Sequence, residues 1–412
     1  MNNKLINDDF LKNKNILILV TGSIAIYKIL ELISMLKKQS ANIAVVMSDS
    51  AMKFIKPLTF EVMSNRDVLH SGNECFCNTN YTNHISYARW ADIALVAPAS
   101  INILAKIRYG IADNIIVSTI LALRTPVLLA PSANVNMIES KQSRDNIDAL
   151  NKLGYIILSP RVSLLACNIV ANGAMADIYE IIFNIKKNLL IDDFWVNKEV
   201  IVTGGGSIER IDLIRCISNF SSAKQASYIA LILYYFGAKV TFISSKFPII
   251  LPLDINCIEV ESSMDYLNAL NKCSRDCILI MAAAISDYIF PNPYAIKLKK
   301  EDLGDVLDLH FIKNIDVLKE VDFKITIGFK AENNTKQSIL NAKKLLVKKN
   351  NGGKNCDIVV LNHIDDNIIG GDYNEMVVVT NNKEIYLRKN DKFSISLELI
   401  NLLKEEIKNI QK

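Results

Sequence analysis

The chain has 412 residues, of which 50% are hydrophobic and 22% charged, and its formal net charge is +4. A chain of this length is too long to fold around one ordinary hydrophobic core, so we expect two domains of about 200 residues each. The composition excludes long disordered tracts. The small net charge and the scattered lysines argue against a nucleic-acid partner and leave acidic small molecules as candidate ligands.

The sequence shows no sign of membrane insertion or export. No apolar run approaches the about 20 residues of a membrane span, and the N-terminal stretch MNNKLINDDFLKNK is polar. The eight cysteines have no paired CxxC spacing, which favours a reducing compartment over a disulfide framework. We therefore expect a cytoplasmic protein that does not bind a membrane.

Five short apolar strands alternate with helical stretches in the first half. We expect them over residues 16–20, 41–47, 92–97, 126–130 and 155–158. Continuously apolar strands that alternate with helices predict a parallel sheet with helices on both faces. Ligands of such sheets bind at the carboxyl ends of the strands. The loops there are small and rich in hydroxyl groups, which suits a phosphate and a flat ring; they are 21–23, 48–50, 98–100 and 131–134.

Three residues of the first half stand apart from this scaffold as candidate chemistry: His84, Asn134 and Cys167. Each also has a structural interpretation. A lone histidine is more often a satisfied surface or core group, an asparagine after a strand often caps a helix, and an isolated cysteine usually fills a core. Taken singly, none of the three predicts a function.

The second half opens with an apolar strand over 200–203 that runs into three glycines, 204–206. Such a turn allows the close backbone approach that a bound phosphate needs, although it also occurs as a plain strand-to-helix connection. The polar residues that follow are Glu209, Asp212, Arg215, Asn219 and the run 221–224. Serine and lysine beside a glycine turn can hold phosphate oxygens, and Arg215 and Asn219 can hold a carboxylate or a carbonyl.

A second set of strands completes this half. We expect them over 240–244, 277–282, 324–328 and 357–361, followed by a hairpin of 376–380 with 384–387 and a closing helix over 394–410. The predicted fold class is therefore α/β, with two doubly wound, mainly parallel, Rossmann-like domains in tandem. The predicted domains are 1–190 and 191–412.

The motifs of the first half resemble those of the flavin-dependent cysteine decarboxylases, in order and in spacing. They are Thr21 to Lys28, Asn83-His84-Ile85 with Trp90-Ala91-Asp92, Ala97 to Asn102, Pro131 to Asn134 with Met137, and Ala166-Cys167. The second half is similar to phosphopantothenate-cysteine ligase. The motifs there are 203–206 through 217–222, 283–288, 297–300, 313–316 and 328–332. Together the two sets resemble the bacterial bifunctional coenzyme A enzymes.

For the first half, the resemblance implies decarboxylation of phosphopantothenoylcysteine to 4'-phosphopantetheine. Loss of CO2 from a cysteine carboxylate needs an electron-accepting cofactor, which in this family is FMN. By resemblance His84 assists proton removal, Asn134 holds the departing carboxylate, and Cys167 protonates the enethiolate during its reduction. A thiol with a pKa near 8.5 is a reasonable acid for that step. The FMN-binding residues implied are Gly22, Ser23, Ile24, Ser48, Ser100 and Asn102.

For the second half, the resemblance implies ligation of cysteine to 4'-phosphopantothenate through an acyl-cytidylate formed from CTP with Mg2+. Asn219 contacts the acyl intermediate, Arg215 and Asn219 bind substrate, and Lys297 supports the reacting phosphate. The CTP-binding residues implied are Met281, Ala282, Ala283, Asp287, Lys297, Phe329, Lys344 and Lys348. Metal ligands are not identified, as is normal for Mg2+ held mainly by phosphates. We expect a homo-oligomer.

The sequence departs from the family pattern in both halves. After Cys167 the flap 168–175 keeps only Gly173 and Met175 of the usual pattern, and Ala133 replaces a methionine. In the second half, alanines stand at 223 and 226 where the family has glycines, Ile208 and Arg210 replace an arginine and a proline, and 350–355 resembles a loop insertion. Stiffening of the flap and crowding by the added methyl groups are the expected consequences.

Two alternatives remain at this point. The departures favour a flavin- and nucleotide-binding partner or regulatory protein that has lost catalysis. Against it, five scattered polar residues survive together, namely His84, Asn134, Cys167, Asn219 and Lys297. The other alternative is a flavoprotein that decarboxylates the C-terminal cysteine of a peptide, which leaves the second half without a role.

Overall fold

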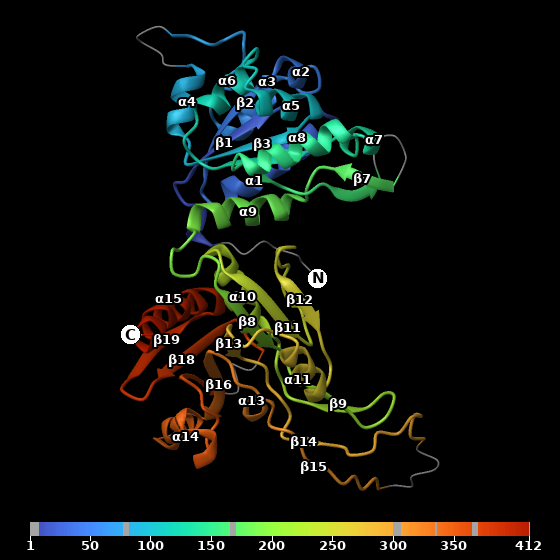
Figure 1. Cartoon of the computed structure of the whole chain (residues 1–412), viewed down its shortest axis with the longest axis vertical. Coiled ribbons are helices and arrows are strands. Elements are labelled where there is room, and N and C mark those ends of the chain that lie inside the picture. Colours follow the sequence, from blue (N-terminus) through green and yellow to red (C-terminus); the bar gives the residue numbers. More distant parts are fainter. Residues whose placement is uncertain are drawn as a thin grey trace. The chain divides into compact units, whose positions relative to one another are not determined.

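The computed structural model describes residues 8–76, 82–164, 170–299, 306–333, 336–364 and 370–411. The chain forms two compact units, of which the N-terminal unit ends at Leu190 and the C-terminal unit begins at Ile191 (Figure 1). Both are α/β units built on a mainly parallel sheet, so the predicted fold class is confirmed.

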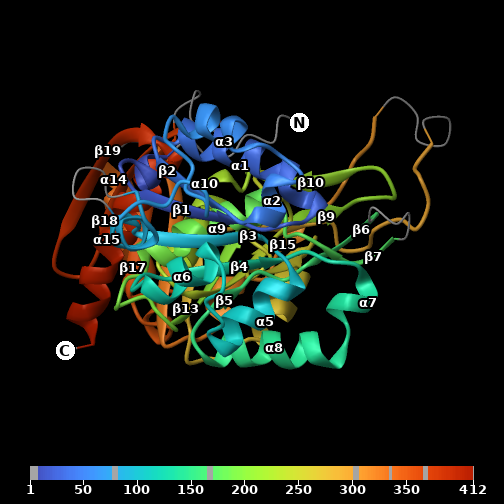
Figure 2. The same ribbon diagram turned by 90° about the horizontal axis from the view of Figure 1, so that it is seen from above.

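The N-terminal unit is built on a five-stranded parallel sheet of order β2-β1-β3-β4-β5 (Figure 2). Its strands are β1 (Asn15–Val20), β2 (Asn42–Met47), β3 (Ile93–Ala99), β4 (Val127–Pro131) and β5 (Ile156–Ile157). Its helices are η1 (Asp9–Leu11), η2 (Ile24–Ile26), α1 (Tyr27–Lys38), α2 (Asp49–Met52), α3 (Pro57–Ser64), α4 (His84–Trp90), α5 (Ile101–Tyr109), α6 (Ile115–Ala122), α7 (Val135–Ile138), α8 (Lys141–Lys152) and α9 (Ile178–Leu190). A hairpin of β6 (Arg161–Leu164) and β7 (Val170–Ala174) lies outside the sheet.

Alternation along β1 shows why helices cover both faces of this sheet. Ile16 and Ile18 are fully buried in a cluster with residues of α1 and α9, whereas Leu17 and Leu19 are fully buried in a second cluster with residues of α4, α5 and α6. Successive side chains of a strand point to opposite faces, so a strand that is apolar at every position requires cover on both sides.

The C-terminal unit is built on an eight-stranded sheet of order β12-β11-β8-β13-β16-β17-β18-β19. Its strands are β8 (Glu199–Gly204), β11 (Lys239–Ser244), β12 (Asn256–Glu259), β13 (Ile278–Met281), β16 (Ile325–Asn333), β17 (Ile358–Ile364), β18 (Tyr373–Val379) and β19 (Glu384–Asp391). All pairs from β12 to β17 are parallel, and β17-β18 and β18-β19 are antiparallel. Its helices are α10 (Lys224–Tyr235), α11 (Ser263–Asn271), α13 (Val317–Glu320), α14 (Lys336–Leu346), η3 (Lys349–Asn351) and α15 (Lys392–Ile410).

Two small hairpins of the C-terminal unit lie outside its main sheet. One pairs β9 (Ile208–Arg210) with β10 (Cys216–Ser218), and the other pairs β14 (Tyr288–Ile289) with β15 (Ile312–Lys313). The backbone N–H of Tyr294 donates to the carbonyl of Ile211 at 2.9 Å. The two hairpins and the described segments that continue β14 and β15 therefore form one projection, which we call the arm (Figure 1).

Several strands were not predicted from the sequence, because they are exposed. The edge strand β12 has no fully buried residue, and β9 and β10 together bury only Glu209. None of them carries the apolar run by which the buried strands were predicted. The expected strand over 155–158 shrinks to two paired residues, Ile156 and Ile157, and β16 continues beyond its expected end at Gly328 to Asn333.

Candidate functional sites

Three loops of the N-terminal unit meet at the carboxyl ends of β1, β3 and β4. The hydroxyl of Thr21 donates to the carbonyl of Pro98 at 2.6 Å and accepts from the backbone N–H of Ser100 at 3.0 Å. The hydroxyl oxygens of Ser23 and Ser132 lie 3.3 Å apart. The hydroxyl-rich loops that the sequence analysis placed at this edge are therefore joined by hydrogen bonds, and Ser132 is a member that it did not single out.

Gly22 allows a close approach between two of these loops. A Cβ atom at position 22 would lie 2.6 Å from Cβ of Ser50, so a larger residue would push the Ser48–Ser50 loop away. Ser48 and Ser100 cap helices by accepting from the backbone N–H of Ala51 and Ile103, at 3.2 and 3.4 Å. These serines thus have a structural role.

The same edge presents groups that suit a phosphate and an apolar ring. Ser23 caps η2, Ser48 caps α2 and Ser100 caps the nine-residue α5, so the N-termini of these helices lie beside the hydroxyl groups. Helix N-termini favour phosphate binding. Asn102 is exposed, and Ile24 keeps 58% of its surface exposed, which leaves an apolar side chain available to a ring. The residues present therefore fit FMN.

His84 is the first residue of α4 and is held by an acidic residue that the sequence analysis missed. Its Nδ1 lies 2.6 Å from Oε1 of Glu74, and the same oxygen accepts from its backbone N–H at 3.1 Å. The rings of Phe76 and His84 pack in a T-shaped arrangement, with their centroids 5.9 Å apart. No sequence signal singles out Glu74, because it lies ten residues before His84 in an irregular segment.

Asn134 caps α7 by accepting from the backbone N–H of Asn136 at 3.0 Å. Its loop is joined to the β6–β7 hairpin, because the N–H of Ala133 donates to the carbonyl of Gly173 at 3.0 Å. A Cβ at position 173 would lie 2.3 Å from the carbonyl oxygen of Ala133, and φ there is 142°, so both geometry and space require glycine. Cys167 falls between β6 and β7, outside the described residues.

The structure does not bring His84 and Asn134 together within one chain. Their helices, α4 and α7, lie at opposite ends of the N-terminal unit (Figure 1). Asn134 therefore lies beside the base of the hairpin that carries Cys167, and His84 lies elsewhere on the same unit.

In the C-terminal unit the three-glycine turn packs closely against other residues of the same unit. A Cβ on Gly204 would lie 2.8 Å from Cβ of Ala226, and one on Gly206 would lie 2.6 Å from the carbonyl oxygen of Asn219. Gly205 has φ 79°, and a Cβ there would lie 2.3 Å from the hydroxyl of Ser245. Each glycine is thus explained by a neighbouring protein group, which favours the structural interpretation of this turn.

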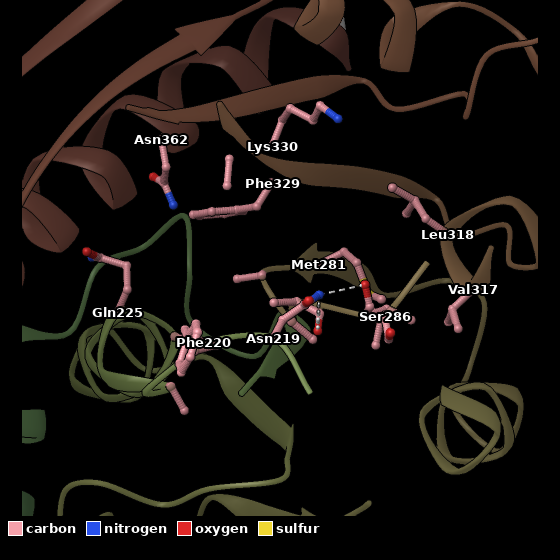
Figure 3. A pocket seen from close by; sticks show the side chains of 18 of the residues that line it. Asn219, Phe220, Gln225, Met281, Ser286, Val317, Leu318, Phe329, Lys330 and Asn362 are labelled. Carbon is pink, nitrogen blue, oxygen red and sulfur yellow. Dashed lines mark hydrogen bonds between the residues drawn. The ribbon is translucent and has the colours of Figure 1, made fainter. Parts of the chain in front are cut away.

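A cavity of about 740 Å³ lies where β13, β16 and β17 end and α10 begins (Figure 3). Its lining includes Asn219 and Ser221 to Gln225, together with the predicted CTP-binding residues Met281, Ala282, Ala283, Asp287 and Phe329. The side-chain N–H2 of Asn219 donates to the carbonyl oxygens of Ala284 and Ile285, at 3.3 and 3.1 Å. Residues from four distant parts of the sequence therefore meet in one cavity.

The charge on the cavity lining favours an anionic ligand. Five lysines and two aspartates line it: Lys224, Lys313, Lys330, Lys354, Lys392, Asp287 and Asp316. Burial, and after it the neighbouring charge of Lys224, lowers the pKa of Lys392. An anion bound beside these lysines would offset that repulsion. Lys224 was singled out from the sequence as a candidate phosphate ligand in the run 221–224. Lys313 and Lys330 lie in quoted motifs and Lys354 in the loop insertion, whereas Lys392 was missed.

Lys297, Lys344 and Lys348 are exposed and do not line this cavity. Nζ of Lys344 donates to Oδ1 of its neighbour Asn341 at 3.1 Å. Lys297 lies on the arm, in a segment without regular secondary structure. The predicted convergence of Lys297 with Asn219 is thus not seen in the described conformation, and the roles of these three lysines stay predictions.

The predicted substrate residue Arg215 is engaged in the arm. Its guanidinium pairs with the carboxylate of Asp212 and also donates to the carbonyl of Leu298 at 3.2 Å, while the N–H of Leu298 donates to Asp212 at 3.2 Å. Arg215 does not line the cavity. In this conformation it holds the Lys297 segment against the β9–β10 hairpin.

Two polar atoms on β17 are buried beside the cavity and have no hydrogen-bond partner within the part of the chain that the structure describes: Oδ1 of Asn362 and Nδ1 of His363. Figure 3 shows the Asn362 carboxamide beside the Phe329 ring. A buried polar atom without a partner costs about 1–3 kcal/mol. A ligand in the cavity could supply the missing partner, so both residues are candidate contacts that the sequence analysis missed.

Within the described ranges, no cluster of three or more histidine, cysteine, aspartate or glutamate side chains could hold a metal ion. No helix among the described residues has the length and apolar character required to cross a membrane.

Two family models match the chain, one in each unit. The model described as Flavoprotein matches residues 5–190, and that described as DNA/pantothenate metabolism flavoprotein C-terminal domain matches residues 195–407. The coenzyme A biosynthesis bifunctional protein CoaBC of Bacillus subtilis (strain 168) is 33% identical over 368 residues, which cover 87% of this chain and 88% of that protein. The chain belongs to the CoaBC family of bifunctional coenzyme A biosynthesis proteins.

Other CoaBC proteins match along nearly the whole chain. That of Borreliella burgdorferi (strain ATCC 35210) is 31% identical over 95% of this chain and 99% of its own length, and that of Escherichia coli (strain K12) is 28% identical over 86% and 87%. As a CoaBC family member, the chain is a bifunctional enzyme of coenzyme A biosynthesis, with a flavoprotein unit that acts as a decarboxylase and a second unit that acts as a ligase.

Two solved structures each match one part of this CoaBC chain. The C-terminal domain of a coenzyme A biosynthesis bifunctional protein CoaBC is 24% identical and covers 53% of this chain and 100% of that one, with a TM-score of 0.43. The FMN-dependent cysteine decarboxylase SpaF is 24% identical and covers 42% and 94%, with a TM-score of 0.37.

Proposed function

We propose that the C-terminal unit joins cysteine to 4'-phosphopantothenate with CTP, and that the N-terminal unit decarboxylates the product with FMN to give 4'-phosphopantetheine. The observation that carries the proposal is the lysine-lined cavity around Asn219. Both phosphopantothenate and a nucleoside triphosphate are anions, and a cavity with five lysines and two aspartates suits them.

In the ligase step a carboxylate must be activated before an amine can attack it. Attack of the phosphopantothenate carboxylate on the α-phosphate of CTP forms an acyl-cytidylate and releases pyrophosphate; attack of the cysteine amine then forms the amide and releases CMP. The cavity lysines offset negative charge on the phosphates. The carboxamide of Asn219 lies at the cavity wall and contacts the acyl intermediate. Mg2+ would supply further positive charge to the triphosphate in this step.

Three residues predicted for this step lie outside the cavity, namely Lys297, Lys344 and Lys348. Lys297 lies on the projecting arm, and Lys344 and Lys348 lie at or just beyond the C-terminal end of α14. Their participation therefore requires a movement of these exposed segments, or a contribution from a second copy of the chain.

In the decarboxylase step, FMN when bound supplies the electron acceptor that a cysteine carboxylate needs in order to lose CO2. The N-terminal unit offers Gly22, Ser23, Ile24, Ser48, Ser100 and Asn102 to hold it. His84 takes a proton from the substrate, and Asn134 orients its carboxylate. Cys167, outside the described residues, protonates the product.

His84 begins α4 and Asn134 caps α7, and these two helices lie at opposite ends of the N-terminal unit (Figure 1). This separation supports the prediction of a homo-oligomer, in which one copy would supply His84 and another Asn134. The arm also carries exposed apolar residues, including Leu213, Ile214 and Ile296, at 61%, 65% and 71% exposure. A cytoplasmic location stays a prediction.

The deciding experiment is an assay of the purified full chain with 4'-phosphopantothenate, cysteine and CTP. We expect phosphopantothenoylcysteine, CMP and pyrophosphate, with pyrophosphate released even when cysteine is omitted. We also expect a yellow protein whose flavin is FMN and which releases CO2 from phosphopantothenoylcysteine. If neither the product nor pyrophosphate forms, the proposed ligase function is wrong and the interpretation as a non-catalytic binding protein is favoured.

A further inference from the structure

The segment that precedes α4 fixes Glu74 firmly next to His84. The carboxamide of Asn73 accepts from the N–H of His70 and donates to the carbonyl of Val68, both at 2.8 Å. The N–H of Cys75 donates to the carbonyl of Thr82 at 2.8 Å. Glu74 lies between these two anchors, so its carboxylate is held on a segment bound to the protein on both sides.

The start of α4 is fixed as well. Asn83 accepts from the N–H of Ser86 at 2.9 Å, and the hydroxyl of Ser86 accepts from the N–H of Asn83 at 3.3 Å, which together form a capping box. His84 follows directly. Its backbone N–H donates to Oε1 of Glu74, and Nδ1 of its ring lies within hydrogen-bond distance of the same oxygen.

This geometry sets the protonation of the imidazole. An ionised carboxylate only accepts hydrogen bonds, so Nδ1 carries the proton. In the neutral ring the other nitrogen, Nε2, then has a free lone pair and can accept a proton. Nε2 has no hydrogen-bond partner among the described residues, and 23% of the side chain is exposed. The arrangement is that of a base held in one tautomer by an acid behind it.

The surroundings of α4 supply little other charge. The helix packs most extensively on α6, with the sequence IIVSTILA, and on β1, with the sequence NILILV, neither of which has an ionisable side chain. Arg66 lies over the rings of Tyr87 and Trp90, 5.2 and 4.3 Å from their centroids, and Arg89 lies on α4 itself. Glu74 is the acid in direct contact with the imidazole.

We propose that Glu74 is the positioning residue of the decarboxylase unit, which orients His84 with Nε2 toward substrate and stabilises the imidazolium after His84 has taken a proton. The inference rests on the proposed role of His84. Glu74 itself touches no substrate. Its carboxylate acts through the ring, first by fixing the tautomer and then by offsetting the positive charge that appears on proton transfer.

The test compares Glu74→Gln with the wild type in the full-length, FMN-loaded protein, as CO2 release from phosphopantothenoylcysteine between pH 5.5 and 9. The amide keeps the shape of the side chain and removes its charge. We expect kcat to fall about 10–100-fold with little change in KM. The acidic limb of the pH profile should also move, because the variant removes the carboxylate that pairs with the imidazolium. Glu31→Gln, which removes an exposed carboxylate from α1, is the matched control and should retain the wild-type rate and profile.

A second measurement does not depend on activity or on the stability of a variant. Nitrogen-15 NMR of histidine-labelled wild-type protein reports which ring nitrogen of His84 carries the proton. We expect Nδ1 to carry it above the pKa of the ring. A neutral ring protonated on Nε2 would overturn the proposal, and so would a Glu74→Gln enzyme with the wild-type rate and an unshifted acidic limb.

The variant His84→Asn separates this inference from the function on which it rests. If His84→Asn abolishes CO2 release while Glu74→Gln does not alter it, the role of His84 stands and that of Glu74 fails. If His84→Asn decarboxylates at the wild-type rate, the proposed role of His84 itself is wrong.

Discussion

The carboxylate of Asp8 lies 2.6 Å from Nζ of Lys186, and the two side chains are 1% and 0% exposed. The pair ties the segment before η1 to α9 across 178 positions of the sequence. Burial raises the pKa of Asp8 and lowers that of Lys186, because it disfavours the charged form of each side chain. The opposite charge of the partner offsets part of this desolvation cost.

Lys186→Met should strongly destabilise the N-terminal unit, because it leaves the buried carboxylate of Asp8 without its partner. We expect a loss of about 3–5 kcal/mol in the free energy of unfolding, measured by urea denaturation. The double variant Asp8→Leu with Lys186→Met should recover most of that loss. Lys152→Met, an exposed lysine of α8, is the control and should change little. A single variant as stable as the wild type would show that the pair contributes nothing.

Ala223→Gly should stabilise the C-terminal unit. Ala223 precedes α10 with φ 60°, in the left-handed region that costs a residue with a Cβ about 1 kcal/mol or more. Glycine removes that cost but has a larger unfolded-state entropy, so we expect a net gain of about 0.5–1 kcal/mol in chemical denaturation. Ala230→Gly, within the same helix, should have the opposite sign. Destabilisation by Ala223→Gly would mean that the methyl group, 4% exposed, contributes more by packing.

Asp212→Asn should loosen the arm. Desolvation alone would raise the pKa of Asp212, but hydrogen bonds from the backbone N–H groups of Arg215, Ile214 and Leu298 and from the Arg215 side chain outweigh it and lower the pKa to about 2. The anchoring of Leu298 is therefore fully present above pH 3.8 and is lost as the pH falls through about 2. In the variant at neutral pH, hydrogen exchange of residues 294–299 should become faster. Unchanged exchange there would show that the carboxylate does not hold the arm.

The buried thiol of Cys356 should resist alkylation. Burial raises its pKa to about 12, and that of Cys277 to about 11, so both stay protonated in the folded chain at pH 8. Iodoacetamide labelling read by mass spectrometry should modify the exposed Cys216 and leave these two intact. Above pH 9 the thiols ionise in the unfolded chain but not in the folded one, so stability should fall as the pH rises toward 12. Rapid labelling of Cys356 at pH 8 would contradict its burial.

Asn362→Ala should weaken nucleotide binding. The buried Oδ1 of Asn362 has no partner in the described structure, and a ligand that donates to it recovers the free energy lost there. We expect about a 10-fold rise in the Kd for CTP by calorimetry. Asn382→Ala, in the exposed β18–β19 turn, should bind CTP normally. Equal affinities for both variants would remove Asn362 from the site.

The positions of the buried strands along the chain and the two-unit organisation could be read from the sequence, because buried parallel strands are apolar at every position and return at regular intervals. The order of the strands within each sheet was not predicted. β1, β2, β3, β8 and β11 all lie within one or two residues of their predicted ranges. The loops at the strand ends could be predicted for the same reason: chain direction alone places Gly22, Ser48 and Ser100 at one edge of a parallel sheet. Strands such as β12 and β9 could not be predicted, since an exposed strand has no apolar pattern.

Which polar groups meet depends on the fold of the whole chain and could not be predicted from the sequence. Glu74 and His84, or Lys354 and Asp316, become partners through loop paths that no periodicity encodes. The sequence also could not predict which polar groups lie apart. His84 and Asn134 belong to helices α4 and α7, which lie apart in the N-terminal unit, and Lys297 does not line the cavity that contains Asn219. A short sequence motif determines which chemical groups a segment carries, because it depends only on neighbouring residues of the chain. The distances between them depend on packing and on hydrogen bonds between distant segments, which are properties of the folded chain as a whole.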